Sequence, residues 1–248
     1  MNPVASTAPL GSQVQAPPYR WLLFDADGTL FDYERAERVA LEQALAGIGV
    51  TFEPGYLATY REINGALWQG VEMGVIKPGE VKVRRFERLL ETIRVAHSPE
   101  ALSAGYLECL ANCSELIEDA EAVLGALHRK YRLAILTNGL TVVQRGRLAR
   151  SAIRHHISDL IISEEIGAAK PAPEFFDKAF ARLGHPGKRE VLMIGDGWVS
   201  DIQGALQYGI DACWYNPGRK PRPANCEITR EIASLRELNN WLIYESSN

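Results

Sequence analysis

The sequence has no long apolar run, few cysteines and no excess of basic side chains. No run reaches the roughly 18 apolar residues that span a bilayer, so we expect no transmembrane helix. Four cysteines do not indicate a disulfide framework in a chain as long as 248 residues. The formal net charge of −4 offers no basic surface for nucleic acid or an anionic membrane. We therefore expect neither nucleic acid nor a membrane among the partners.

Residues 1–18 lack both the basic start and the apolar stretch of a secretory signal. They are rich in Pro, Ala, Ser and Gln, a composition typical of a disordered tail. Over the whole chain, 46% of the residues are hydrophobic and 23% are charged, as in ordinary soluble proteins with a large core. We expect a cytoplasmic protein whose disordered tail covers 1–18.

Beyond residue 18, short apolar runs alternate with segments of helical periodicity. The predicted strands lie at 21–24, 133–136, 160–162, 191–194 and 212–214. Helical patterns lie at 119–130, 141–152, 173–183 and 200–208. Strands joined by single helices indicate parallel βαβ units, and uninterrupted apolar strands indicate a sheet covered on both faces. The predicted fold is α/β, with a Rossmann-like doubly wound parallel sheet.

The interval 33–116 contains no convincing strand. Helical patterns occupy 34–46, 81–95 and 100–117, and the pairs Pro54-Gly55 and Pro78-Gly79 interrupt them. So long a helical segment exceeds a single crossover between two neighbouring strands. We therefore predict an inserted α-helical cap domain at 33–116 and a core domain formed by 19–32 and 117–248.

Polar side chains follow four of the predicted strands. In chain order they are Asp25 and Asp27, Thr137 and Asn138, Lys170, and finally Asp196 and Asp201. In open α/β sheets, ligands bind outside the carboxyl ends of the strands, so these side chains should meet at one edge. Chance could supply one such residue, but a set in register at four strand ends favours a functional site.

The motifs DADGTL, LTNG, AAKP and GDGWVSD follow one another as the four motifs of the haloacid dehalogenase (HAD) superfamily do. The chain resembles this superfamily from residue 21 to about residue 241. Its helical interval resembles the α-helical C1-type cap of one HAD subclass. The resemblance implies a Mg²⁺-dependent phosphatase that hydrolyses small phosphate monoesters through an aspartyl-phosphate intermediate.

The resemblance also implies roles for the first and last acids. Asp25 would be the nucleophile, and Asp27 would protonate the leaving oxygen and then activate the water. Mg²⁺ would be bound by the carboxylates of Asp25 and Asp196 and by the backbone carbonyl of Asp27. Because a halide leaving group takes no proton, the dehalogenases of the superfamily lack the second acid. The presence of Asp27 therefore favours phosphate chemistry.

A phosphate dianion is repelled by carboxylates, so the site also requires positive charge and hydrogen-bond donors. The resemblance assigns these tasks to Lys170, to Thr137 and to the backbone of Asn138, which would contact the phosphoryl oxygens. Asp201 would orient the metal ligands or hold Lys170. Asp32 is predicted to be the N-cap of a helix that begins near residue 33.

Substrate choice is expected to depend on the cap. The segments LFDYERAERVALEQAL, INGALW and ISEEIGAAKPAPEFF resemble the noncanonical, house-cleaning pyrimidine 5′-nucleotidases of the superfamily. This resemblance favours a pyrimidine nucleoside 5′-monophosphate as substrate. Asn64 could contact a base edge, and Trp68 or Phe31 could stack on a base, although each residue type also occurs in protein cores.

Several alternatives share the core motifs. Phosphoglycolate, a sugar phosphate or an acylneuraminate phosphate could be the substrate, and a phosphoglucomutase-like enzyme would differ mainly in its cap. A receiver-like signalling domain also gathers acids, Thr and Lys around Mg²⁺, but it has no helical insertion. An inactive binding protein is disfavoured because no core residue is missing. Trp198 stands where relatives have a smaller residue, which leaves substrate size open, and both a monomer and a homodimer fit the sequence.

Overall fold

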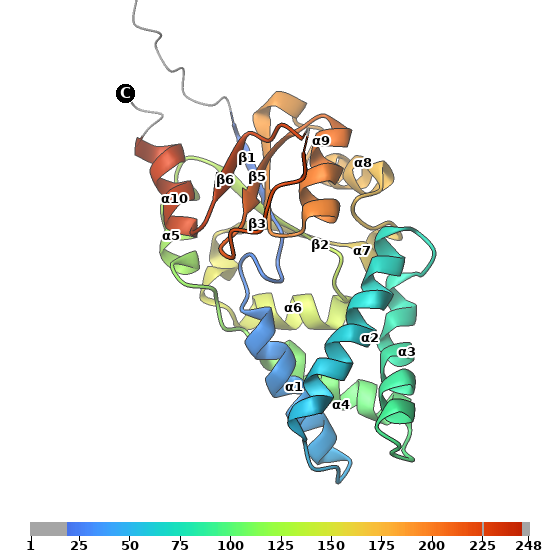
Figure 1. Cartoon of the computed structure of the whole chain (residues 1–248). Helices are drawn as coiled ribbons and strands as arrows, with labels where there is room; N and C mark the ends of the chain where they lie inside the picture. The colour runs from blue at the N-terminus through green and yellow to red at the C-terminus, as the bar shows by residue number, and fades with distance from the viewer. Residues whose placement is uncertain (1–18, 225, 245–248) are drawn as a thin grey trace, which may run out of the picture.

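The computed structural model describes residues 19–224 and 226–244, so the tail predicted at 1–18 lies outside the described residues. Six parallel strands form one sheet in the order β3-β2-β1-β4-β5-β6 (Figure 1). They are β1 (Trp21–Phe24), β2 (Arg132–Thr137), β3 (Ile157–Ile162), β4 (Val191–Gly195), β5 (Asp211–Tyr215) and β6 (Arg230–Ile232). The five predicted strands are confirmed, and β6 is an addition that its short, charged sequence does not predict.

Helices connect the strands. They are α1 (Tyr33–Gly47), α2 (Pro54–Glu72), α3 (Pro78–Thr92), α4 (Pro99–Asn112), α5 (Ala120–Leu127), α6 (Thr141–Arg150), α7 (Ser163–Ile166), α8 (Pro173–Arg182), α9 (Gly204–Tyr208) and α10 (Leu235–Asn239). Shorter 3₁₀ and π segments are η1 (Ala152–His155), η2 (Lys188–Glu190), η3 (Trp198–Gln203) and η4 (Asn240–Tyr244). The helix predicted at 200–208 is in fact divided between η3 and α9. No helix among the described residues is long and apolar enough to cross a membrane.

The central strand β1 buries side chains on both faces of the sheet. Leu22 and Phe24 share a hydrophobic cluster with side chains of α5 and α10. Trp21 and Leu23 belong to a second cluster with side chains of α8 and α9. A strand covered on both faces has no solvent-facing position, which explains its uninterrupted apolar sequence. The predicted doubly wound α/β fold is confirmed.

The helices α1 to α4 surround a hydrophobic cluster of their own, shared with the first turn of α6. Figure 1 shows them together on one side of the sheet, coloured from blue to green. The chain enters and leaves this region through two paired segments. The amide of Asp32 donates to the carbonyl of Glu115 over 3.0 Å, and the amide of Ile117 donates to that of Leu30 over 2.9 Å. The division into a cap at 33–116 and a core remains our proposal.

Prolines begin helices here rather than interrupting them. Pro54 is the first residue of α2 and Pro78 the first of α3, positions at which a missing N–H has no intrahelical partner to lose. When Pro54-Gly55 is interpreted as an interruption, the sequence does not predict α2. Asp32 is the N-cap of α1, as predicted, because its side chain accepts from the amide of Arg35 over 3.1 Å.

Candidate active site

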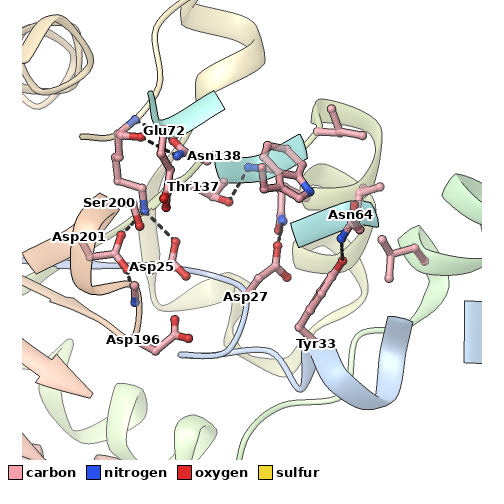
Figure 2. Close-up of a pocket in the computed structure, with 18 of the residues that line it drawn as sticks. Asp25, Asp27, Tyr33, Asn64, Glu72, Thr137, Asn138, Asp196, Ser200 and Asp201 are labelled. Atoms are coloured by element: carbon pink, nitrogen blue, oxygen red, sulfur yellow. Dashed lines mark hydrogen bonds and ion pairs between the residues drawn. The ribbon is translucent and has the colours of Figure 1, made fainter. Parts of the chain in front are cut away.

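A cavity of about 280 Å³ lies at the carboxyl ends of β1, β2 and β4. The four sequence motifs meet at this edge. Their strands are paired in parallel, so the carboxyl ends of the strands lie together. Every predicted site residue lines the cavity: Asp25, Asp27, Asn64, Trp68, Thr137, Asn138, Lys170, Asp196 and Asp201. Figure 2 shows Asp25, Asp196 and Asp201 on one side of the view, Asn64 and Tyr33 on the other, and Asp27 between the two groups.

Lys170 lies beneath the cavity and is 1% exposed. Its Nζ donates to Oδ1 of Asp25 over 2.7 Å, to Oδ1 of Asp201 over 2.6 Å and to the carbonyl of Leu136 over 2.6 Å. Burial disfavours the charged ammonium, but the two carboxylates outweigh burial and raise the pKa of Lys170. Lys170 is therefore a fixed positive charge beside Asp25.

Three acids converge next to this ammonium. Asp25, Asp196 and Asp201 each offer a carboxylate oxygen within 4.8 Å of the others. Burial raises the pKa of Asp25 to about 7 although Lys170 opposes the shift. Burial and then the charge of Asp25 raise the pKa of Asp196 to about 7. Such a crowded, oxygen-only donor set fits a hard divalent cation, which would remove the repulsion among the carboxylates.

The turn after β1 brings the loop against Asp196. Gly28 has φ +86°, and a Cβ at this position would lie 2.7 Å from Oδ2 of Asp196, so both the conformation and the space require glycine. The next residue, Thr29, donates from Oγ1 to Oδ1 of Asp196 over 3.1 Å and accepts from its amide over 3.0 Å. Thr29 thus fixes the orientation of Asp196, a role that the sequence does not indicate.

The loops after β2 and before α8 hold each other in place. The side chain of Asn138 donates to the carbonyl of Lys170 and accepts from its amide, each over 2.8 Å. Thr137 is 2% exposed, and its Oγ1 accepts from the amide of Gly139 over 3.0 Å. The side chain of Asn138 therefore positions Lys170, in addition to the phosphate contact predicted for its backbone.

Asp27 contacts two side chains of α6 that the sequence analysis did not single out. Gln144 Nε2 donates to Oδ2 of Asp27 over 2.6 Å. Arg147 Nη1 donates to Oδ1 of Asp27. The two donors are three residues apart, so they share one face of α6, and that spacing after LTNGL is the signal that could have identified them.

The helix α2 contributes a stripe of three residues to the cavity. Asn64, Trp68 and Glu72 are spaced by four residues and therefore lie along one face. Nδ2 of Asn64 donates to Tyr33 Oη over 3.3 Å, and Oδ1 of Asn64 accepts from Arg85 Nη1 over 3.3 Å. Near the other end of the stripe, Glu72 has a pKa raised by burial.

Arg85, on α3, is a buried cation at the end of the cavity that Asn64 also lines. It is 2% exposed, and its Nε and Nη2 have no hydrogen-bond partner among the described residues. Its guanidinium lies 4.6 Å from the ring centre of Tyr106 and 5.0 Å from that of Phe86. In the sequence, Arg85 is spaced by four residues from the buried Val81 and Leu89, so a charge on the apolar face of a helix is the signal that would have found it.

Phe31 and Trp198 both lie outside the cavity, so the hypothesis that Phe31 stacks on a base is wrong. Phe31 is 1% exposed in the core beneath Arg147 and is not among the residues that line the cavity. Trp198 packs edge-on against Trp214, with ring centres 4.7 Å apart, and does not line the cavity either. Both rings follow the ordinary rule that aromatic side chains fill cores. Of the candidate aromatic residues, only Trp68 remains in a position to contact a substrate.

Known proteins resemble the chain over most of its length. A family model described as haloacid dehalogenase-like hydrolase matches residues 19–209. The pyrimidine 5′-nucleotidase YjjG of Escherichia coli (strain K12) is 32% identical over 222 residues, 90% of this chain and 97% of the relative. The pyrimidine 5′-nucleotidase PynA of Streptococcus pneumoniae is 36% identical over 225 residues, 90% of this chain and 95% of the relative.

A solved structure supports the same assignment. The crystal structure of the HAD-hydrolase YfnB of Bacillus subtilis, bound to magnesium, matches with a TM-score of 0.84 at 33% identity. The match covers 91% of this chain and 99% of that protein. Sequence and structure agree with the four motifs that meet in the cavity. The chain belongs to the haloacid dehalogenase-like hydrolase family.

Proposed function

We propose that the protein is a Mg²⁺-dependent phosphatase that hydrolyses pyrimidine nucleoside 5′-monophosphates through an aspartyl phosphate on Asp25. One observation carries this proposal: the cavity has two chemically different ends. Lys170 and the acids of the core form one end, and the buried donors of Arg85 form the other. Two relatives named as pyrimidine 5′-nucleotidases support the substrate class.

The core end suits a phosphoryl group and a metal ion. The carboxylates of Asp25 and Asp196, with the backbone carbonyl of Asp27, would bind Mg²⁺, which supplies positive charge toward the phosphate oxygens. Lys170 adds a fixed charge, and Asp201 holds its Nζ in place. The oxygen-only donor set at this end supports the choice of Mg²⁺ over a softer metal.

The reaction has two steps with opposite proton transfers. The carboxylate of Asp25 attacks phosphorus, the bond to the leaving oxygen breaks, and the carboxyl proton of Asp27 passes to that oxygen. A water molecule then attacks the aspartyl phosphate and gives a proton to the Asp27 carboxylate. The bond between phosphorus and Asp25 breaks, so inorganic phosphate leaves and both acids return to their starting forms.

The cap end suits a flat group that carries hydrogen-bond acceptors. Asn64 and Glu72 are eight residues apart, about 12 Å along a helix, which is comparable to the length of an extended nucleoside monophosphate. Trp68 lies between them and offers a ring face. Buried donors without partners are costly, so a ligand whose carbonyl oxygens accept from Arg85 Nε and Nη2 would recover that cost.

A carboxylate would also pair with Arg85, so acylneuraminate phosphates and phosphoglycolate are the second candidates. A substrate panel separates these classes: UMP, dUMP and dTMP beside phosphoglycolate, an acylneuraminate phosphate and hexose phosphates. We expect kcat/KM, measured by release of inorganic phosphate, to be highest for the pyrimidine nucleotides. A higher value for a carboxylate-bearing or sugar phosphate would overturn the nucleotide assignment.

Two further assays address the remaining alternatives. Conversion of glucose 1-phosphate to glucose 6-phosphate without release of phosphate would indicate a phosphoglucomutase-like enzyme. A phospho-aspartate that persists for hours after treatment with acetyl phosphate would indicate a receiver-like domain. The family match argues against the latter, and we expect neither result.

A further inference from the structure

Both oxygens of Asp27 have their own hydrogen-bond donor from α6. Gln144, which is 2% exposed, donates to Oδ2 over 2.6 Å. Arg147, which is fully buried, donates to Oδ1 in a charge-assisted hydrogen bond. The side chain of Asp27 nevertheless lines the cavity and is 27% exposed. Its carboxyl group is therefore accessible to a substrate but held at two points.

Arg147 is itself fixed by contacts on several sides. Its Nε donates to the carbonyl of Cys113 over 2.8 Å, and its guanidinium carbon lies 4.5 Å from the ring centre of Phe31. Cys113 is the C-cap of α4, where helix carbonyls lack intrahelical partners and carry partial negative charge. A guanidinium bound to a carbonyl, a ring and a carboxylate has little freedom to rotate.

Gln144 depends on a close approach to the loop after β2. A Cβ on Gly139 would lie 2.4 Å from Gln144 Nε2, so the amide group occupies space that only glycine leaves free. Gln144 lines the cavity, whereas Arg147 is not among the lining residues. One donor therefore holds Asp27 from the cavity side, and the other holds it from the protein interior.

We propose that Arg147 and Gln144 are positioning residues that aim the Asp27 carboxyl group at the leaving oxygen of the substrate. The inference rests on the proposed function, in which Asp27 is the acid and then the base. Each donor occupies one lone pair of one oxygen, and a carboxylate oxygen has two, so a site for the transferred proton remains. A misplacement of about 1 Å in such a group can lower a rate about 100-fold.

This role predicts a dependence on the leaving group. An alkyl phosphate releases a strongly basic alkoxide that must receive the proton of Asp27 as its bond to phosphorus breaks. p-Nitrophenyl phosphate releases a stable phenolate that leaves without a proton. If Arg147 only joins α6 to the end of α4, its loss would slow both esters to the same extent.

The test is a rapid-quench single-turnover experiment on the full chain with Mg²⁺, using ethyl phosphate, UMP and p-nitrophenyl phosphate. In Arg147→Met and Gln144→Met we expect release of the alcohol from both alkyl esters to slow about 10–100-fold, because a misplaced acid loses part of the roughly 100- to 10,000-fold that general acid catalysis contributes. Release of p-nitrophenol should change less than about 3-fold, and hydrolysis of the phosphoenzyme should slow for all three esters. Equal slowing of alkyl and aryl esters overturns the proposal.

Two further variants keep the test independent of folding. The ratio of the alkyl to the aryl rate is measured within one preparation, so an inactive fraction cancels. Arg145→Met is the matched control, because Arg145 lies on the same helix but is exposed and forms a bidentate pair with Glu165 at 2.5 and 2.8 Å. Its ratio should equal that of the wild type. Arg147→Lys keeps the positive charge but loses the planar guanidinium with its several N–H donors. Its ratio of alkyl to aryl rate should lie between those of the wild type and Arg147→Met.

Asp27→Asn separates the two proposals. If Asp27 is the acid, this variant shows the same dependence on the leaving group as Arg147→Met, but more strongly. If Asp27→Asn slows the alkyl esters more than the aryl ester but the variants of Arg147 and Gln144 do not, only the positioning role is wrong. If Asp27→Asn slows all three esters equally, the proposed role of Asp27 fails and the positioning role fails with it.

Discussion

The ammonium of Lys170 and the carboxylate of Asp201 form an ion pair in which Nζ and Oδ1 are 2.6 Å apart and both side chains are 1% exposed. Because water cannot replace either partner, the loss of one leaves a buried charge poorly compensated. Asp25 also contacts Lys170, so the ammonium would then shift toward the nucleophile. The pair thus links the stability of the fold to the position of Asp25, the nucleophile that we propose.

For Asp201→Asn we expect the free energy of unfolding to fall by up to about 3 kcal/mol, the lower part of the range for a broken buried pair, because Asp25 still compensates Lys170. We also expect kcat to fall about 10–100-fold as the nucleophile is displaced. Urea unfolding and phosphate release measure the two effects. Glu174→Gln, which removes an exposed pair with Lys178, should cost less than about 1 kcal/mol. A loss for Asp201→Asn no larger than this control would contradict the prediction.

Asp25→Asn should abolish turnover, because an amide cannot attack phosphorus and no other carboxylate occupies the same position. We expect kcat to fall by more than about 1,000-fold, as for the loss of other catalytic nucleophiles. The melting temperature should be nearly unchanged, because removal of a crowded buried carboxylate offsets the loss of one of the two carboxylate partners of Lys170. Activity of more than a few per cent in a highly purified sample would refute the assignment of the nucleophile.

Removal of divalent cations should abolish the phosphatase activity. After dialysis against EDTA we expect no phosphate release, and Mg²⁺ should restore it. At 100 times its dissociation constant, the ion should also stabilise the fold by about 2.7 kcal/mol, seen as a higher melting temperature. Asp196→Asn should lose most of this thermal shift. Turnover that survives EDTA at the full rate would refute a metal requirement.

The metal-free protein should become less stable as the pH rises from about 4 to about 7, the opposite of what a carboxyl group with a lowered pKa causes. The pKa of Asp196 is raised from its ordinary value of 3.8 to about 7, so the folded state binds a proton that the unfolded chain has lost. Between these two values, the free energy of unfolding therefore decreases as the pH rises, and it levels off above about pH 7. Urea unfolding in EDTA measures this slope, which should be smaller in Asp196→Asn. An identical slope in both proteins would show that another group is responsible.

Arg85→Met should impair nucleotides selectively. The variant removes the unpartnered donors at the cap end but keeps a side chain of similar length, so we expect kcat/KM for UMP to fall about 10–100-fold and that for ethyl phosphate to fall much less. Arg84→Met is the matched control, because the neighbouring Arg84 is exposed and pairs with Glu80 over 2.9 Å. Equal effects on UMP and ethyl phosphate would show that Arg85 serves the fold of the cap and not the substrate.

The core of the molecule could be predicted from the sequence because its signals are local. The apolar run before Asp25 indicates a strand by itself, and the acids at its end need no distant partner to be noticed. Because parallel strands end at the same edge of a sheet, residues as far apart as Asp25 and Asp196 could be placed together without knowledge of the strand order. The missing elements include β6, which has only three residues, α2, whose first residue Pro54 also fits a loop, and the short helices α7 and α10.

The supporting residues of the site could not be predicted in the same way. Arg147 and Asp27 are 120 residues apart, and nothing near either one reveals their contact. In isolation, the segment around Arg147 reads as an ordinary charged helix. The burial of Arg85 likewise depends on Tyr106, which reaches it only when α3 and α4 pack together. Such roles are properties of the tertiary packing.

The paired segments through which the chain passes between the sheet and the helices α1 to α4 have an evolutionary consequence. The hydrogen bonds from Asp32 to Glu115 and from Ile117 to Leu30 bring the two crossing points together, so the helical insert occupies one gap in the core. An insert whose ends are neighbours can be lengthened, shortened or exchanged without changing the strand register. Evolution could thus exchange the helices α1 to α4, and with them the substrate preference that we assign to this region, while the residues at the strand ends stay the same.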